Sequence, residues 1–263
     1  MIDLTFDAGS GVTQHSMKRA LILGAGYTGQ RLKDVLQSRG YQVFSTRRSA
    51  SASDFHFDLN AAETWESLPE VDVSFLTFPC EPGQLVGRFL SKQSMRLGRV
   101  ICIGTTSSYL IQRENELISE GSPVDPQDER ALGELVAIQQ GATVVRSAGI
   151  YGPGRDPRRW VSAGRVGPSS KLVNFVHVSD LVEILIQAYE RGRKGAVYLA
   201  ADGRPQRWDQ LIQSWVSEFG IQVPSGAAES RRASKRVDPA QTLQELGVTL
   251  LFPDVQSGVR SLA

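Results

Sequence analysis

The sequence is poor in cysteine, balanced in charge and free of long apolar runs. Cys80 and Cys102 are its only cysteines, too few for a disulfide framework in 263 residues. The three histidines, His15, His56 and His177, form no zinc-ligand pattern, so we expect no metal site. Because 29 lysines and arginines offset 28 aspartates and glutamates, the net charge of +1 gives no electrostatic reason to expect nucleic acid or an anionic membrane as a partner.

The beginning of the chain has neither the basic start nor the apolar core of a secretory signal. No run in the sequence approaches the ~20 apolar residues of a membrane span. Residues 1–17 are expected to form a flexible leader, or to reflect an over-extended start site. Together with the two thiols, which we expect to be reduced, these features predict a soluble cytoplasmic protein.

The most informative stretch is a strand-length apolar run, Arg19–Leu23, which leads into three glycines spaced G-x-G-x-x-G. Apolar residues at helical spacing follow at Leu32, Val35 and Leu36. A strand, a tight turn and a helix in this order offer free backbone N–H groups to a pyrophosphate, although glycine-rich turns also occur for packing alone. The residues expected to hold a dinucleotide here are Gly24, Ala25, Gly26, Tyr27, Thr28 and Gly29.

The next predicted strand, residues 41–46, is followed by two arginines and no acid. A dinucleotide site places an acid near this point to bind the ribose 2′-hydroxyl, or a base to bind a 2′-phosphate. Arg47 and Arg48 therefore favour NADP(H) over NAD(H) as the cofactor. The alternative is that they are two solvated arginines at the edge of a loop.

Strands and helices alternate along the first part of the chain. The predicted strands are residues 19–23, 41–46, 55–59, 71–78, 99–103, 143–146, 175–178 and 196–200, and the main predicted helices are 27–39, 84–97, 128–140, 181–189, 208–219 and 238–246. Leu132 and Leu135 are expected on the inner face of their helix, and residues 111–128 in a surface loop. This alternation predicts an α/β fold, a Rossmann-type doubly wound parallel sheet in the strand order 3-2-1-4-5-6. A ligand crevice is expected where the strand order reverses.

Beyond residue 149 the alternation breaks. Residues 151–171 are rich in basic side chains, namely Arg155, Arg158, Arg159, Arg165 and Lys171. Such a segment beside a cofactor crevice could receive an anionic substrate, but a run of charge is more often a solvated face. We expect a dinucleotide-binding core and a small C-terminal substrate lobe, the core from residues 18–150 with 172–200 returning to it and the lobe from 151–171 and 201–263.

Four motifs together carry a resemblance to a known family. They are Gly24–Gly29, Thr105–Tyr109, Arg146–Arg155 and Asn174–Leu181. In order and spacing these segments resemble the short-chain dehydrogenase/reductase superfamily, and within it the extended and atypical branches of NAD-dependent epimerase/dehydratases. The resemblance runs from about Lys18 to the C-terminus.

The resemblance implies further contacts at the adenine, the adenosine ribose and the nicotinamide. Asp58 and Leu59 are expected near the adenine, and Thr77, Phe78 and Pro79 near the adenosine ribose. Ser147 and Ala148 are expected to line the nicotinamide. Thr105 takes the place of the Ser/Thr that hydrogen-bonds the substrate oxygen, with Thr106 beside it.

The chain departs from the family at the pair that does the acid–base chemistry. Redox members carry Tyr-x-x-x-Lys, in which the lysine binds the nicotinamide ribose and lowers the pKa of the tyrosine. Here Pro126 stands at the tyrosine place and Arg130 at the lysine place. Arg130 could still hold the ribose, but a guanidinium does not release a proton near neutral pH. Tyr109 and Tyr151 could substitute as proton donor, although both places are commonly packed aromatics.

These observations predict an NADP(H)-binding oxidoreductase or epimerase/dehydratase that acts on a small carbonyl or alcohol, or on a sugar nucleotide. Thr105 and Thr106 would position the oxygen, Tyr109 would donate the proton, and Arg130 would hold the ribose. The alternative is a non-catalytic NADP(H)-binding redox sensor or scaffold, which the missing Tyr-x-x-x-Lys favours. Many members of the superfamily are homodimers, but no dimer-forming face stands out in this sequence.

Overall fold

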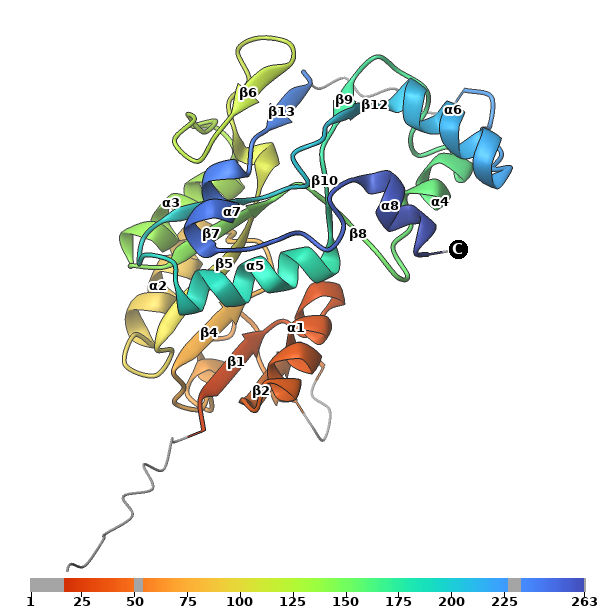
Figure 1. Ribbon diagram of the computed structural model, residues 1–263. Coiled ribbons are helices and arrows are strands. Elements are labelled where there is room, and N and C mark those ends of the chain that lie inside the picture. The colour runs from red at the N-terminus through yellow and green to blue at the C-terminus, as the bar shows by residue number, and fades with distance from the viewer. Residues whose placement is uncertain (1–16, 50–53, 227–232, 263) are drawn as a thin grey trace, which may run out of the picture.

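A central seven-stranded sheet, parallel throughout, organises the protein (Figure 1). The computed structural model describes residues 17–49, 54–226 and 233–262, so the predicted leader lies outside it except for Met17. The sheet strands are β1 (Arg19–Leu23), β2 (Gln42–Arg47), β3 (Phe55–His56), β4 (Val73–Leu76), β5 (Arg99–Thr105), β7 (Thr143–Ser147) and β11 (Val197–Ala200). Their order, β3-β2-β1-β4-β5-β7-β11, confirms the predicted doubly wound sheet and adds β11 as a seventh, outer strand.

Helices cover both faces of the sheet because its strands are apolar on both sides. On one face, α1 (Tyr27–Ser38) and α5 (Val178–Glu190) pack over a core that includes Ala20 and Ile22. On the other, α2 (Gly83–Lys92) and α3 (Glu129–Gln139) pack over Leu21 and Leu23. The alternation of neighbouring β1 residues between the two cores is the two-residue period of a strand. Among the described residues, no helix is long and apolar enough to cross a membrane.

The inner face of α3 differs from the prediction. Leu132 and Leu135 are 39% and 38% exposed, whereas Ala131, Gly133 and Ala137 are buried. The reason is close packing, since a Cβ placed on Gly133 would overlap the carbonyl oxygen of residue 80. Only small residues fit where this helix meets the loop after β4, so the leucines lie outward.

The small lobe comprises β8 (Gly149–Tyr151), α4 (Pro157–Ser162), β9 (Leu172–Val173), β10 (Phe175–His177), β12 (Gln206–Arg207), α6 (Trp208–Phe219) and α8 (Val255–Arg260). Its helices gather at one end of the molecule (Figure 1) around a core that includes Tyr151, Trp208 and Trp215. Strand β8 pairs with β10, and β9 pairs with β12, so the segment expected to return to the main sheet does so only from α5 onward.

Three further short elements, two strands and one helix, lie outside the main sheet. Strand β6 (Glu116–Ile118), inside the segment predicted as a loop, pairs in parallel with β13 (Lys235–Val237). Helix α7 (Ala240–Leu246), from the part of the chain assigned to the lobe, packs against α5 and β11 of the core.

Candidate functional site

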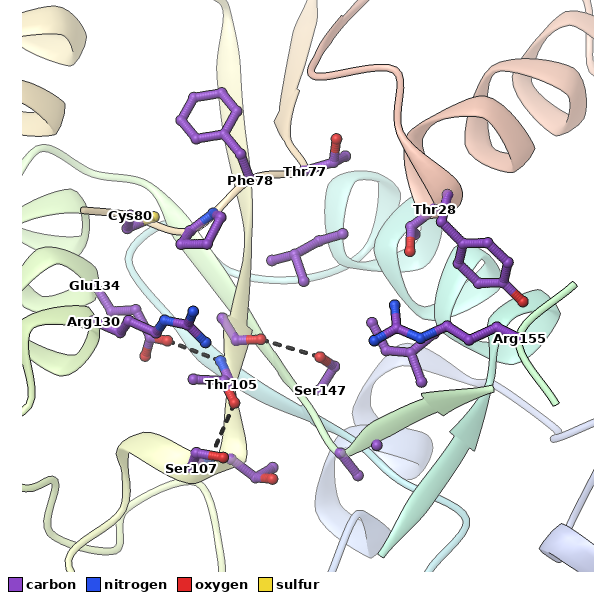
Figure 2. Close-up of a pocket in the computed structure, with 18 residues that line it drawn as sticks. Thr28, Thr77, Phe78, Cys80, Thr105, Ser107, Arg130, Glu134, Ser147 and Arg155 are labelled. Atoms are coloured by element: carbon purple, nitrogen blue, oxygen red, sulfur yellow. Dashed lines mark hydrogen bonds between the residues drawn. The ribbon is translucent and has the colours of Figure 1, made fainter. Parts of the chain in front are cut away.

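A cavity of 440 Å³ opens at the carboxyl ends of β1, β4, β5 and β7 (Figure 2). This is the point where the chain switches sides of the sheet, with β2 on one side of β1 and β4 on the other, and where ligands of such sheets bind. The predicted residues that line the cavity are Tyr27, Thr28, Thr77, Phe78, Pro79, Thr105, Thr106, Arg130, Ser147 and Ala148. Sequence reasoning did not assign Cys80, Ile103, Glu134 and Ile150, which also line it.

The glycine motif forms the tight turn that the sequence predicts. Gly24 has a φ of 95°, and its N–H donates to Thr46 Oγ1 at 3.1 Å. A Cβ on Gly29 would lie 2.5 Å from the carbonyl oxygen of Gly24, so a glycine is required for the helix to approach the strand. Gly26 caps α1 without a side-chain hydrogen bond, which leaves the first N–H groups of the helix available to an anion.

Two neighbouring hollows continue from this turn toward the end of β2. Together they are lined by Gly24, Ala25, Gly26, Arg47, Arg48, Asp58, Leu59, Thr77 and Phe78, all predicted cofactor contacts. Of the predicted cofactor residues, Gly29 alone lines neither the cavity nor these two hollows, and it serves the packing of α1 instead. Asp58 has a lowered pKa because the main chain and side chain of Asn60 hydrogen-bond it, with a smaller contribution from the charge of Arg48.

An acid that sequence reasoning missed sits beside the two arginines. Asp54 Oδ2 accepts a hydrogen bond from Arg47 Nε at 2.9 Å, and Oδ1 accepts one from Ser45. Lys33 Nζ lies 3.7 Å from the same carboxylate, whose side chain is only 6% exposed. The acid therefore orients Arg47 and offsets part of its charge, while Arg48 adds a second cation to the hollow.

A buried ion pair supports the strand ends beneath the cavity. Glu134 Oε2 lies 2.6 Å from Arg146 Nε, and the two residues are 1% and 2% exposed. Glu134 Oε1 accepts the backbone N–H of Thr105 at 2.9 Å. Burial raises the pKa of Glu134, and the charge of Arg146 opposes this rise. The carboxylate thus joins α3, β5 and β7 at Thr105, the first residue of the Thr105–Tyr109 motif.

The hydroxyl cluster predicted to meet the substrate oxygen lies at the cavity wall. Thr105 Oγ1 accepts the N–H of Ser107 at 3.1 Å, and Ser147 Oγ donates to the Gly104 carbonyl at 3.1 Å (Figure 2). Arg130 reaches the cavity from α3 and lies 3.4 Å from a carboxylate oxygen of Glu81. Because the Arg130 side chain is 48% exposed, this ion pair restrains it only weakly.

Tyr109, predicted as the proton donor, lies buried outside the cavity. Its ring is 3% exposed and lies 4.7 Å from the Arg146 guanidinium, and it does not line the cavity. Its hydroxyl donates to the carbonyl of Glu120 at 3.5 Å, and burial raises its pKa. Tyr151 is fully buried in the lobe, with its hydroxyl 3.4 Å from the Asp254 carbonyl oxygen. Neither tyrosine lines the cavity.

The chain is similar to known proteins in sequence and in structure. No family model matches the chain. Protein YeeZ of Escherichia coli K12 is 25% identical over 272 residues, which cover 90% of this chain and 97% of that protein. Short-chain dehydrogenase/reductase family 42E member 1 of Bos taurus is 34% identical over 110 residues, but these cover only 34% of this chain and 28% of that protein.

Solved structures share the fold over nearly their whole length. A Methylobacillus flagellatus protein, thought to be an NAD-dependent epimerase/dehydratase, has a TM-score of 0.76 at 23% identity, over 94% of this chain and 98% of that one. RMD from Pseudomonas aeruginosa, complexed with NADPH, has a TM-score of 0.73 at 15% identity, over 94% of this chain and 97% of that one. MoeE5 in complex with UDP-glucose and NAD has a TM-score of 0.72 at 19% identity, over 93% of this chain and 100% of that one.

These comparisons confirm the resemblance to NAD-dependent epimerase/dehydratase-like short-chain dehydrogenase/reductases that the motifs predict. In fold, the chain is similar to proteins whose structures were solved with NAD or NADPH bound.

Proposed function

We propose that this protein binds NADP(H) and transfers a hydride between the nicotinamide and a carbonyl or alcohol carbon of its substrate, as a reductase, epimerase or dehydratase. One observation carries the proposal. A single cavity is lined on one side by Tyr27 and Thr28, at the N-terminus of α1, and on the other by Thr105 and Thr106. A pyrophosphate site and a set of hydroxyls that can hold a substrate oxygen therefore face the same space.

The preference for NADP(H) is supported by the charge around the end of β2. Lys33 and Arg47 pair with one carboxylate, Asp54, and Arg48 lines the same hollow, so the group carries a positive excess that suits a 2′-phosphate. Charge-assisted hydrogen bonds from guanidinium groups to phosphate are among the stronger polar contacts. An acid left free to accept a ribose 2′-hydroxyl would favour NAD(H) instead, but Asp54 is already paired with Arg47.

The substrate is proposed to be anionic, with a sugar nucleotide as the leading class. The lining of a groove of 710 Å³ beside the cavity includes Arg159 and Arg165 together with Trp160. Cationic side chains suit a phosphate, and an aromatic ring suits a base or a sugar face. The MoeE5 structure, which holds UDP-glucose together with NAD, agrees with such a substrate. The two free thiols are the reason that we propose a cytoplasmic location.

The roles proposed in the reaction are positional. Thr105 and Thr106 hold the substrate oxygen, Ser147 and Ala148 lie along the nicotinamide, and Arg130 binds the nicotinamide ribose. We leave Tyr109 out of these proposed roles, because its side chain is buried and does not line the cavity.

A second candidate function, a non-catalytic NADP(H) sensor, is favoured by one specific observation. The ionisable groups of the cavity wall are poorly suited to move a proton. Glu134 is held by Arg146, the Tyr27 hydroxyl is shielded from solvent, and Arg130 and Arg155 carry guanidinium groups, which are not the usual acid–base side chains of enzymes. A protein that only binds the dinucleotide needs none of these groups to titrate.

The two functions are separated by a turnover assay. The purified protein is incubated with NADPH and a panel of sugar nucleotides and small carbonyl compounds, and the nicotinamide absorbance and the products are followed. The enzyme proposal predicts turnover of at least one compound, lowered at least tenfold in Thr105→Val, because that variant cannot hydrogen-bond the substrate oxygen. NADPH binding without any turnover across the panel would contradict the enzyme and support the sensor.

A further inference from the structure

A tight turn at the start of the small lobe fixes the backbone of Arg155. The N–H of Arg155 donates to the Gly152 carbonyl at 2.8 Å, and the N–H of Gly152 donates back to the Arg155 carbonyl at 3.3 Å. Gly152 and Gly154 have φ angles of 145° and 80°, which side-chain-bearing residues rarely adopt. The arginine therefore leaves the turn at a defined point and in a defined direction.

The same turn is tied directly to the glycine motif through Arg31 of α1. Arg31 Nη2 donates to the Pro153 carbonyl at the tip of the turn at 2.7 Å, and Nη1 donates to the Tyr27 carbonyl at 2.8 Å. The Arg31 guanidinium also lies 3.9 Å from the centre of the Tyr27 ring. The position of the turn is thus set relative to the N-terminus of α1, not only relative to the lobe.

From this turn the Arg155 side chain extends into the cavity. Figure 2 shows its guanidinium between Thr28 and Ser147, and it lies 5.6 Å from the centre of the Tyr27 ring. In the described part of the chain, no carboxylate forms an ion pair with it, and the adjacent Asp156 is held by Arg158 at 2.7 Å. An unpaired cation therefore faces the end of the helix that itself attracts anions.

We propose that Arg155 binds the pyrophosphate of the dinucleotide from the side opposite α1, so that the small lobe completes the cofactor site. This inference rests on the proposed function and adds a residue that neither the glycine motif nor the two arginines after β2 indicate. A substrate diphosphate is the other source of the same chemistry. The cofactor is favoured because Arg31 ties the turn to α1, and because the guanidinium lies beside Thr28, which belongs to the predicted pyrophosphate loop.

The test measures binding of ADP-ribose and of UDP by calorimetry, with the full chain and three variants. ADP-ribose carries the pyrophosphate of the cofactor without the nicotinamide, and UDP carries the diphosphate of a sugar nucleotide. The variants are Arg155→Gln, Arg155→Lys and the matched control Arg159→Gln, which removes the same charge from the neighbouring groove outside the cavity. Thermal unfolding of each variant establishes that it is folded.

The proposal predicts that Arg155→Gln weakens ADP-ribose binding about tenfold to a hundredfold, since a charge-assisted contact is lost. Arg155→Lys should recover part of the affinity, because it keeps the charge but not the planar fork. Arg159→Gln should change the affinity for ADP-ribose less than threefold.

Three results would overturn the inference. Equal losses in Arg155→Gln and Arg159→Gln would mean that only the general positive charge matters. A loss of UDP affinity with unchanged ADP-ribose affinity would assign Arg155 to a substrate. Normal ADP-ribose binding by all variants would remove Arg155 from the site and leave the proposed function intact, whereas a wild-type protein that binds no dinucleotide would overturn the proposed function itself.

Discussion

The buried ion pair between Glu134 and Arg146 allows a quantitative prediction for Glu134→Gln. The substitution keeps the size of the side chain and an oxygen that can accept the Thr105 N–H, but removes the charge that faces a guanidinium only 2% exposed. Breaking a buried pair from one side costs about 3–5 kcal/mol, because the partner charge is left uncompensated. Since Gln retains one acceptor, we take about 3 kcal/mol as the expected loss of unfolding free energy.

The assay is thermal unfolding of wild type, Glu134→Gln and the matched control Glu81→Gln. For a domain of this size, a loss of about 3 kcal/mol corresponds to a Tm lowered by roughly 6–12 °C. Glu81 also faces an arginine, but its side chain is 40% exposed, so its loss should cost at most about 1 kcal/mol. A Glu134→Gln protein as stable as Glu81→Gln would refute the reasoning that burial makes the first pair costly to break.

Three further predictions concern the cavity and its surroundings. Tyr109→Phe should leave turnover unchanged within twofold in the assay with NADPH, because its hydroxyl contacts a main-chain carbonyl outside the cavity; a tenfold loss would restore it as proton donor. Gly29→Ala should weaken NADPH binding more than tenfold in a fluorescence titration, because the new methyl would press on the Gly24 carbonyl; unchanged affinity would contradict the tight turn. Burial, and secondarily the charge of Arg31, lower the pKa of His177 from 6.5 to about 4. As the pH drops from about 6.5 to about 4, the unfolded state therefore binds a proton that the folded state does not, and the free energy of unfolding falls. The difference in unfolding free energy between wild type and His177→Asn should shift by up to about 3 kcal/mol across that window, and a difference that does not change with pH would contradict the buried neutral imidazole.

The core of the fold could be predicted from sequence because its signals are local. The central strands β1 and β4 are short apolar runs, and the glycine motif between Leu23 and Leu32 specifies strand, turn and helix within a dozen residues. The inner face of α3 could not be predicted, because Gly133 lies inward for lack of space, whereas hydrophobicity alone favours Leu132.

The lobe was harder to predict because its elements are short and pair over long distances. Strand β6 is three residues long, and its partner β13 lies more than a hundred residues further along the chain. No periodicity emerges from three residues, so the pairing has no signal in a single sequence.

In the candidate site too, residues placed by local sequence signals were predictable, and residues placed by distant contacts were not. Motif positions such as Thr105 and Ser147 line the cavity as predicted, since the strand that carries each one fixes its place. The contributions of Asp54 and Arg155 depend on which loop folds against which, and the burial of Tyr109 depends on its contact with a buried arginine. Spacing within the sequence does not encode these contacts.

The most direct test of the central claim is a fluorescence titration of the purified protein with NADPH and, separately, with NADH. We expect NADPH to bind at least tenfold more tightly than NADH, a difference of about 1.4 kcal/mol, and Arg48→Ala to remove most of this preference. Binding of neither nucleotide would contradict the claim that the cavity at the end of β1 is a dinucleotide site.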